Sequence, residues 1–181
     1  MLKIMSIVTA LLLLPLQAAA NPRPGFHSGP VFSSFGDIAS VRSDQPIPEG
    51  TVFRVAFDVS EKATPGQLNR AFDSAARFIN MHVEAGVPIT DIHVAIVVHG
   101  GAAVDLLSPA AYAGRNDGAT NGSAVAIAGL AAQGVEFWLC GQTAAAQQIT
   151  KVDLLPDVGL SLSAMTAFAL LQQRGYTVNP F

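Results

Sequence analysis

The sequence contains a single cysteine, Cys140, whose neighbours are those of a reactive thiol. It follows an apolar run with the pattern of a strand and precedes a predicted helix. Backbone N–H groups at the start of a helix stabilise a thiolate, so we expect the pKa of the Cys140 thiol to lie below its ordinary value. The residues expected to bind substrate beside it are the first three of that helix, Gly141, Gln142 and Thr143. The alternative is a buried and inert cysteine, because free cysteine is among the most buried residue types.

The neighbours of Cys140 also exclude two well-known cysteine chemistries. Thr143 stands where a Cys-x-x-Cys dithiol would carry its second sulfur, and Ala146 stands where a Cys-x5-Arg phosphate loop would need its arginine. A chemistry that uses one thiol remains: carrying sulfur, forming a mixed disulfide, or sensing oxidation.

A second candidate, His99, follows another apolar run, residues 92–98, and is itself followed by Gly100 and Gly101. Glycines lack the side chains that would keep a ligand or a backbone segment away, so we expect both to line the site. We expect His99 to orient or polarise a sulfur species held near Cys140. The alternative is that His99 binds a loop carbonyl and only shapes the turn. Esterase chemistry has no support, because the sequence contains no Gly-x-Ser-x-Gly nucleophile elbow.

Other ligand classes find little support in the sequence. His93 and His99 lie six residues apart on one predicted strand, about 20 Å at 3.3 Å per residue, which is too far to share a metal ion. No Gly-x-Gly-x-x-Gly or Gly-Lys-Ser/Thr motif is present, so we expect no nucleotide and no other cofactor. The formal net charge is −3 and the basic residues are scattered, so we expect no binding to nucleic acid.

The first residues have the pattern of an export signal. Lys3 precedes a short apolar stretch over residues 7–16, and the run Ala18-Ala19-Ala20 supplies the small residues of a cleavage site. We therefore expect a signal peptide over residues 1–20, a periplasmic protein after cleavage, and no contact with the membrane thereafter.

The rest of the chain divides into a Pro/Gly-rich extended arm, residues 21–50, and one α/β domain, residues 51–181. Strands are predicted at 52–59, 92–98, 135–139, 158–162 and 176–178. Helices are predicted from Pro65 to 85 and at 123–132, 142–149 and 164–174. Strands that alternate with helices over short connections indicate a doubly wound, mainly parallel sheet of five strands. Ligands in such sheets bind at the carboxyl ends of strands, where His99 and Cys140 stand.

A set of short motifs lies at the ends of these elements: Asn80, Val97 to Ala102, Gly134 to Gly141, Ser163-Ala164 and Gly175-Tyr176. In these motifs, and over residues 51–181, the chain resembles the exported branch of the DsrE/DsrF-like family. The resemblance implies a flavodoxin-like α/β layer, homo- or hetero-oligomers, and a cysteine that carries persulfide sulfur. That role would fall on Cys140.

We therefore expect a periplasmic sulfur-handling protein that binds or transfers sulfane sulfur through a persulfide on Cys140. Such a sulfurtransferase-like carrier would have small sulfur species, or a protein that donates or accepts sulfur, as its partners. The alternative is a non-catalytic oligomeric module for binding or assembly, with a buried structural cysteine.

We also expect the protein to form a homo-oligomer. The predicted helix over residues 123–132 is apolar nearly all round, and a single-layer sheet covers it from one side only. A second copy is a common way to cover the rest. The alternative cover is the arm, which contains three phenylalanines, folded back over this helix.

Overall fold

The structure is a computed structural model in which residues 24–179 are described. The expected signal peptide, residues 1–20, lies outside these residues. No helix within residues 24–179 is long and apolar enough to cross a membrane.

The described chain forms one α/β domain around a five-stranded sheet. The strands are β1 Phe53–Val59, β2 Ile92–Val98, β3 Glu136–Cys140, β4 Val158–Ser161 and β5 Thr177–Asn179. They lie in the order β4-β3-β2-β1-β5, and every neighbouring pair is parallel. The predicted doubly wound α/β fold is therefore confirmed. The helices are α1 Arg70–Glu84, α2 Pro109–Arg115, α3 Ala124–Ala132, α4 Gly141–Ala146 and α5 Ala164–Gln173.

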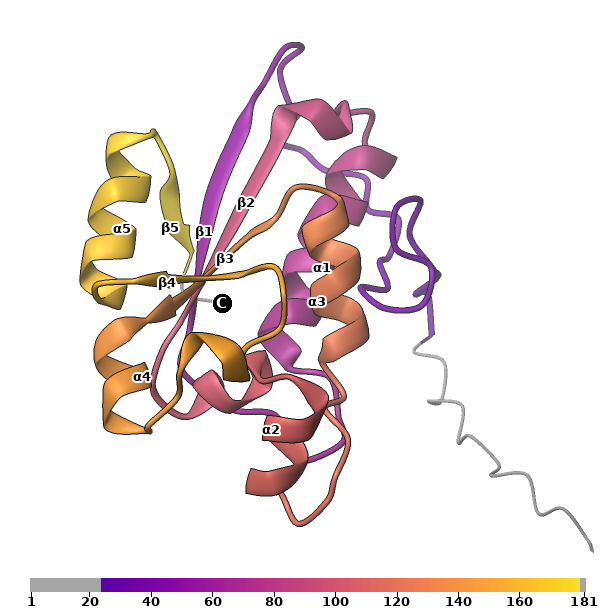
Figure 1. Ribbon diagram of the computed structural model, residues 1–181. Coiled ribbons are helices and arrows are strands. Elements are labelled where there is room, and N and C mark those ends of the chain that lie inside the picture. The colour runs from indigo at the N-terminus through magenta and orange to yellow at the C-terminus, as the bar shows by residue number, and fades with distance from the viewer. Residues whose placement is uncertain (1–23, 180–181) are drawn as a thin grey trace, which may run out of the picture.

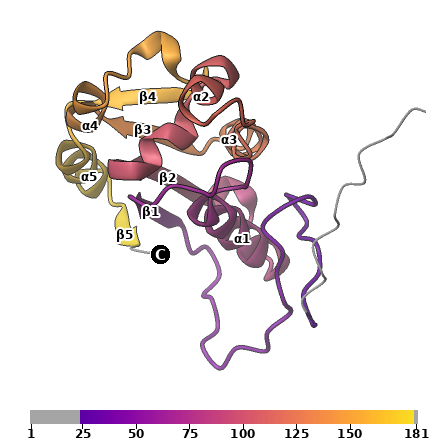
Figure 2. The same cartoon turned by 90° about the horizontal axis from the view of Figure 1, so that it is seen from below.

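The two faces of the sheet are covered differently, as Figures 1 and 2 show: α1 and α3 lie on one face and α5 on the other. The face of α1 and α3 holds the larger core, with Phe57, Phe72 and Phe137 among its side chains. The face of α5 has a smaller core built on Ala56 and Ala95. Small side chains on the sheet let α5 pack closely with little buried volume, so this face is the thinner one.

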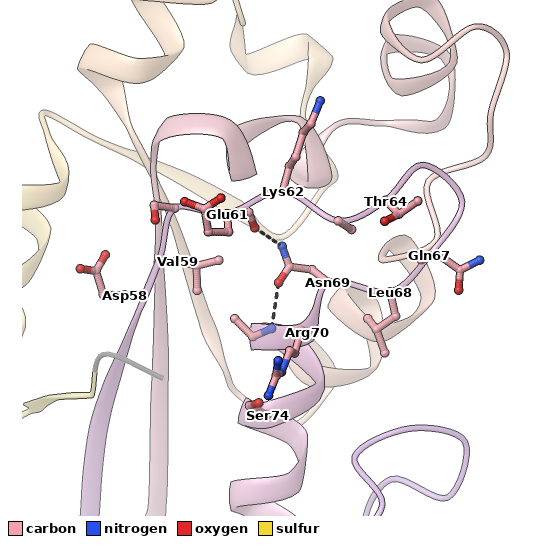
Figure 3. A pocket seen from close by; sticks show the side chains of 13 residues that line it. Asp58, Val59, Glu61, Lys62, Thr64, Gln67, Leu68, Asn69, Arg70 and Ser74 are labelled. Atoms are coloured by element: carbon pink, nitrogen blue, oxygen red, sulfur yellow. Dashed lines mark hydrogen bonds between the residues drawn. The ribbon is translucent and has the colours of Figure 1, made fainter. Parts of the chain in front are cut away.

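Helix α1 begins later than the sequence predicted. Pro65 and Gly66 form a turn instead of the first helical residues, since Gly66 has a φ of 81° that a helix cannot contain. The helix is instead capped by Asn69, whose side-chain oxygen accepts from the N–H of Ala71. The Asn69 amide nitrogen donates to the carbonyl of Glu61, which ties the loop after β1 to the start of α1 (Figure 3).

The segment after β3 also differs from the prediction. The strand includes Cys140 itself, and α4 ends at Ala146 instead of Ile149. Gln148 has a φ of 54°, which ends the helical conformation. Ile149 and Leu154 then pack into the core on the side of α1 and α3, so the chain returns over that face before it enters β4.

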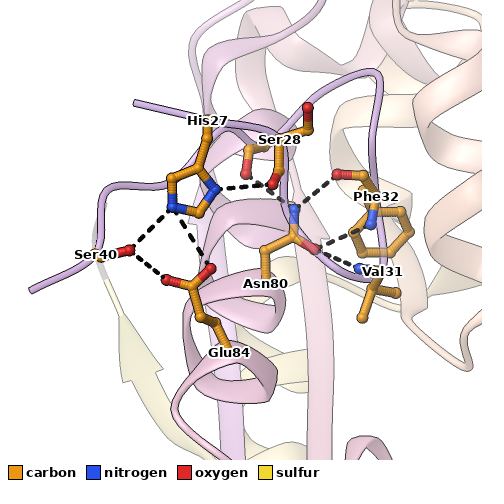
Figure 4. A network of polar contacts seen from close by, with 8 residues as sticks. His27, Ser28, Val31, Phe32, Ser40, Asn80 and Glu84 are labelled. Atoms are coloured by element: carbon orange, nitrogen blue, oxygen red, sulfur yellow. Dashed lines mark hydrogen bonds and ion pairs between the residues drawn. The ribbon is translucent and has the colours of Figure 1, made fainter. Parts of the chain in front are cut away.

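The arm lies against α1 and is organised by one buried side chain. His27 and Ile38 pair through two backbone hydrogen bonds, which close the arm into a loop. Asn80 on α1 fills this loop: it accepts from the N–H groups of Val31 and Phe32 and donates to the carbonyls of Phe32 and Gly36. Asn80 is fully buried, so these bonds satisfy arm groups that are shielded from water (Figure 4).

A second, more exposed set of contacts holds the outer part of the arm. The Ser40 hydroxyl donates to Glu84 on α1, and Nε2 of His27 contacts both Ser40 and Glu84 (Figure 4). Phe35 approaches Gly129 of α3, so the arm also reaches the helix that the sequence analysis singled out as apolar. Val125 on that helix stays 77% exposed.

We expect Asn80→Ala to lower the free energy of unfolding by about 2 kcal/mol or more, because it leaves buried arm N–H and C=O groups without partners. Urea unfolding followed by tryptophan fluorescence measures this. Gln172→Ala, at an exposed position of α5, is the matched control and should change stability little. An Asn80→Ala protein as stable as wild type would show that the arm contributes nothing to the fold.

Candidate functional site

Three polar side chains stand in a row at the carboxyl edge of the sheet. The register pairs Asp58 of β1 with Val97 of β2, and Val98 of β2 with Leu139 of β3. One further step along this register brings His99 beside Cys140, and neighbouring strands lie about 4.8 Å apart. Side chains alternate between faces along a strand, so Asp58, His99 and Cys140 all lie on the face of α5.

Cys140 is buried, with 6% of its surface exposed, and is surrounded by hydrogen-bond donors. Burial is the largest single effect on its pKa and favours the neutral thiol. Hydrogen bonds from the backbone N–H and the hydroxyl of Thr143 act in the opposite direction, as do the N–H groups of Ala164 and Gln142. Together the donors outweigh burial, so the pKa of the Cys140 thiol lies below its ordinary value. This is the environment of a thiolate.

Thr143 links the two strand ends. Its hydroxyl oxygen accepts from the N–H of Gly100 at 3.2 Å, and its hydroxyl also bonds the sulfur of Cys140. Gln147 strengthens the link, since its side-chain amide donates to the carbonyl of Gly100 at 2.7 Å. The loop after β2 is thus fixed to α4, and the His99 end and the Cys140 end form one unit.

Gly141 and Gln142 hold the site closed on the side of β4. A Cβ at Gly141 would lie 2.6 Å from the carbonyl oxygen of Ser161, so only glycine fits between the ends of β3 and β4. The Gln142 side chain donates to the carbonyl of Leu162 at 3.2 Å. This close approach brings the start of α5, and with it the N–H of Ala164, to the sulfur.

His99 binds a carboxylate instead of a loop carbonyl. Its Nε2 lies 2.8 Å from Oδ1 of Asp58, and the two side chains are 33% and 40% exposed. Gly100 and Gly101 continue from His99 along the backbone of Ser60. The sequence motifs indicated His99 as a site residue but did not indicate Asp58. The available signal for Asp58 was an acidic residue near the end of a buried strand, on the same face as Ala56.

The strand order explains why these groups meet here. The chain proceeds outward from β1 to β4 and then crosses to β5 on the far side of β1, with α5 on the opposite face from α1 and α3. The strand order therefore reverses between β1 and β5, at the strand that carries Asp58. In open α/β sheets, ligands bind outside the carboxyl ends of strands at such a change of direction.

A hollow of about 580 Å³ lies between the end of β1 and the start of α1 (Figure 3). Asp58, Lys62, Asn69 and Arg70 are among its lining residues, and Cys140 is not. The side chain of Asn69 is fully bonded to the protein, to Glu61, Ala71 and Asp105. Asp105 also accepts from the N–H of Ala63, and burial, the main effect on its carboxyl, raises its pKa.

Comparisons with known proteins agree with this fold. The sequence profile of the DsrE/DsrF-like family matches residues 54–180. The chain is an α/β protein of that fold, with a thiol and a histidine at adjacent strand ends, and it belongs to the DsrE/DsrF-like family. A solved structure of a protein of unknown function, MTH1491 from Methanobacterium thermoautotrophicum, is similar, with a TM-score of 0.50 and 18% identity. The match covers 71% of this chain and 99% of that one. No curated protein matches the sequence.

We expect the apparent pKa for alkylation of Cys140 to lie below the value of about 8.5 for a free thiol, because the donors favour the thiolate. Thr143→Val should raise this pKa, since it removes the hydroxyl donor, whereas Thr143→Ser retains the hydroxyl and should leave it nearly unchanged. The measurement is the rate of iodoacetamide reaction with the native protein as a function of pH. A wild-type value at or above that of a free thiol would contradict the assignment.

Proposed function

We propose that this protein is an exported sulfur carrier in which Cys140 holds sulfane sulfur as a persulfide. Membership of the DsrE/DsrF-like family supports a function in sulfur transfer. The observation that carries the proposal is the set of four donors around a thiol that has no second cysteine anywhere in the chain. A thiolate without a resolving cysteine keeps the sulfur it receives until an acceptor takes it.

The loading step follows from thiolate chemistry. The Cys140 thiolate attacks the outer sulfur of a donor persulfide, R–S–SH, and forms a new S–S bond. The old S–S bond breaks, its electron pair goes to the inner sulfur of the donor, and R–S⁻ leaves. Cys140 then carries –S–SH, and no external oxidant or reductant is needed. The N–H groups of Gln142, Thr143 and Ala164 stay in place to receive the negative charge when the sulfur leaves again.

We expect the mature protein to gain the mass of sulfur atoms when it is incubated with polysulfide, and to lose this mass when a reducing thiol is added. Intact mass spectrometry measures both changes. Cys140→Ser should gain nothing. Wild-type protein without an adduct, or an equal adduct on Cys140→Ser, would defeat the proposal.

A second candidate is a non-catalytic module for binding or assembly, in which Cys140 is a core residue. The 6% exposure of Cys140 is the observation in its favour. The alkylation experiment separates the two candidates, because a core cysteine in the folded protein reacts negligibly at every pH that keeps the fold.

Self-association is part of the proposal. Val125 on α3 and Leu162 and Met165 around the start of α5 are 77%, 72% and 78% exposed. Exposed apolar side chains of this size favour coverage by another chain, and symmetric copies are the commonest source.

We expect static light scattering of the mature protein at micromolar concentration to give a multiple of the single-chain mass. Deletion of residues 21–45 then tests whether the arm contributes to the contact. The control is Asn80→Ala at the same concentration, which loosens the arm without shortening the chain. A single-chain mass for the intact mature protein would rule out a stable oligomer.

A further inference from the structure

Asp58 and His99 are side chains at the carboxyl edge that the proposed function leaves unused. The Oδ1 of Asp58 accepts from Nε2 of His99 at 2.8 Å. Asp58 lies near the end of β1, in a strand that is otherwise buried at its centre, on the same face of the sheet as His99 and Cys140. The three strands β1, β2 and β3 thus contribute a carboxylate, an imidazole and a thiol in that order across the sheet.

The contact with Asp58 determines which nitrogen of His99 carries the proton. An ionised carboxylate only accepts hydrogen bonds, so Nε2 must be the N–H of the neutral ring. Nδ1 then has a free lone pair. Within residues 24–179, Nδ1 of His99 has no hydrogen-bond partner. The ring therefore presents a base on the side that Asp58 does not occupy.

Resting on the proposed function, we propose that Asp58 is a positioning residue that holds His99 with Nδ1 free to move a proton at the sulfur of Cys140. This arrangement extends the site across three strands.

The unloading step supplies a proton for such a group to take. An acceptor thiol R–SH gives its proton to Nδ1, and the resulting thiolate attacks the outer sulfur of Cys140–S–SH. A new S–S bond forms between the acceptor and the outer sulfur as the S–S bond to Cys140 breaks, with its electron pair going to Sγ of Cys140. The products are R–S–SH, the Cys140 thiolate and the imidazolium of His99, so the total charge is unchanged, and Nδ1 then releases its proton to water.

Few other charged groups surround His99. The loop after β1 brings Glu61 and Lys62 past Gly101, and Cys140 lies on β3. The start of α4 contributes Gly141, Gln142 and Thr143, and the start of α5 contributes Ala164, none of which titrates. Asp58 is therefore the carboxylate in direct contact with the His99 ring.

The test uses a mixed disulfide of Cys140 with 2-mercaptoethanol, prepared on the whole mature protein, and dithiothreitol as the attacking thiol. Cleavage needs the same proton transfer from an incoming thiol, and intact mass follows it over a range of pH. His99→Gln gives the rate without the base. We expect Asp58→Asn to be slower than wild type by about tenfold or more at neutral pH, because the ring is no longer held with Nδ1 free. Asp157→Asn, at the opposite end of the sheet, removes the same charge and should behave as wild type.

A second measurement does not depend on reaction rates. Ring nitrogen chemical shifts in ¹⁵N NMR should show His99 protonated at Nε2 in wild type, and a shift toward the Nδ1–H form in Asp58→Asn. A wild-type ring protonated at Nδ1, or an Asp58→Asn protein with unchanged rates, would overturn the inference.

The outcomes also separate this inference from the proposed function. A protein that gives the expected Asp58 effect but gains no sulfur from polysulfide retains the Asp58–His99 role and loses the persulfide function. A protein that gains sulfur but shows no Asp58 effect retains the function and loses this inference. A Cys140 that forms no mixed disulfide contradicts both.

Discussion

The parallel register of the sheet is the constraint on which the site depends. Because β1, β2, β3 and β4 run in the same direction and pair without a bulge, their carboxyl ends fall on one edge. Alternation then decides which side chains share a face there, and it places Asp58, His99 and Cys140 together. A slip of one residue in β3 would turn Cys140 into the larger core and expose Leu139. The large apolar side chains of that core, Phe137 and Leu139 among them, oppose such a slip and so fix the position of the thiol.

The two faces of the sheet carry cores of different size, and this difference also helps to position the site. The larger core under α1 and α3 supplies most of the buried apolar surface, and the arm extends its cover through Asn80 and Phe35. Ala56 and Ala95 are among the sheet residues under α5, and the N–H of Ala164 at the start of α5 reaches Cys140. Stability therefore comes mainly from one side of the sheet, while the polar groups of the site gather on the other. The arm contacts α1, on the opposite face of the sheet from the thiol, so we expect these contacts to affect stability and not the site.

The sequence was sufficient to predict the fold and the two strand-end motifs, because β-branched runs and glycine stops are strong local signals. Pro65 and Gly66 were a misleading signal. A proline is typical of a helix start, but the positive φ of Gly66 is not helical, so the helix begins later and Asn69 is its N-cap. Asp58 was missed because a single acid near a strand end also fits an exposed position. The N–H of Ala164 was missed because it reaches Cys140 only through the close approach of β3 and β4 at Gly141. Both depend on contacts between distant segments, which local patterns do not encode.

If Cys140 carries sulfur as proposed, the donors around it favour one direction of transfer. Lowering the pKa of a thiol increases the fraction of thiolate but reduces the nucleophilicity of that thiolate, and it makes the same thiolate a better leaving group. The hydrogen bonds from Thr143, Ala164 and Gln142 therefore help Cys140 more when it gives sulfur up than when it takes sulfur. Burial restricts access in both directions, since a sulfur with 6% exposure reacts only with partners that fit the edge of the sheet. A thiol built in this way suits a carrier that receives sulfur from a reactive donor and releases it readily to an acceptor that the site admits.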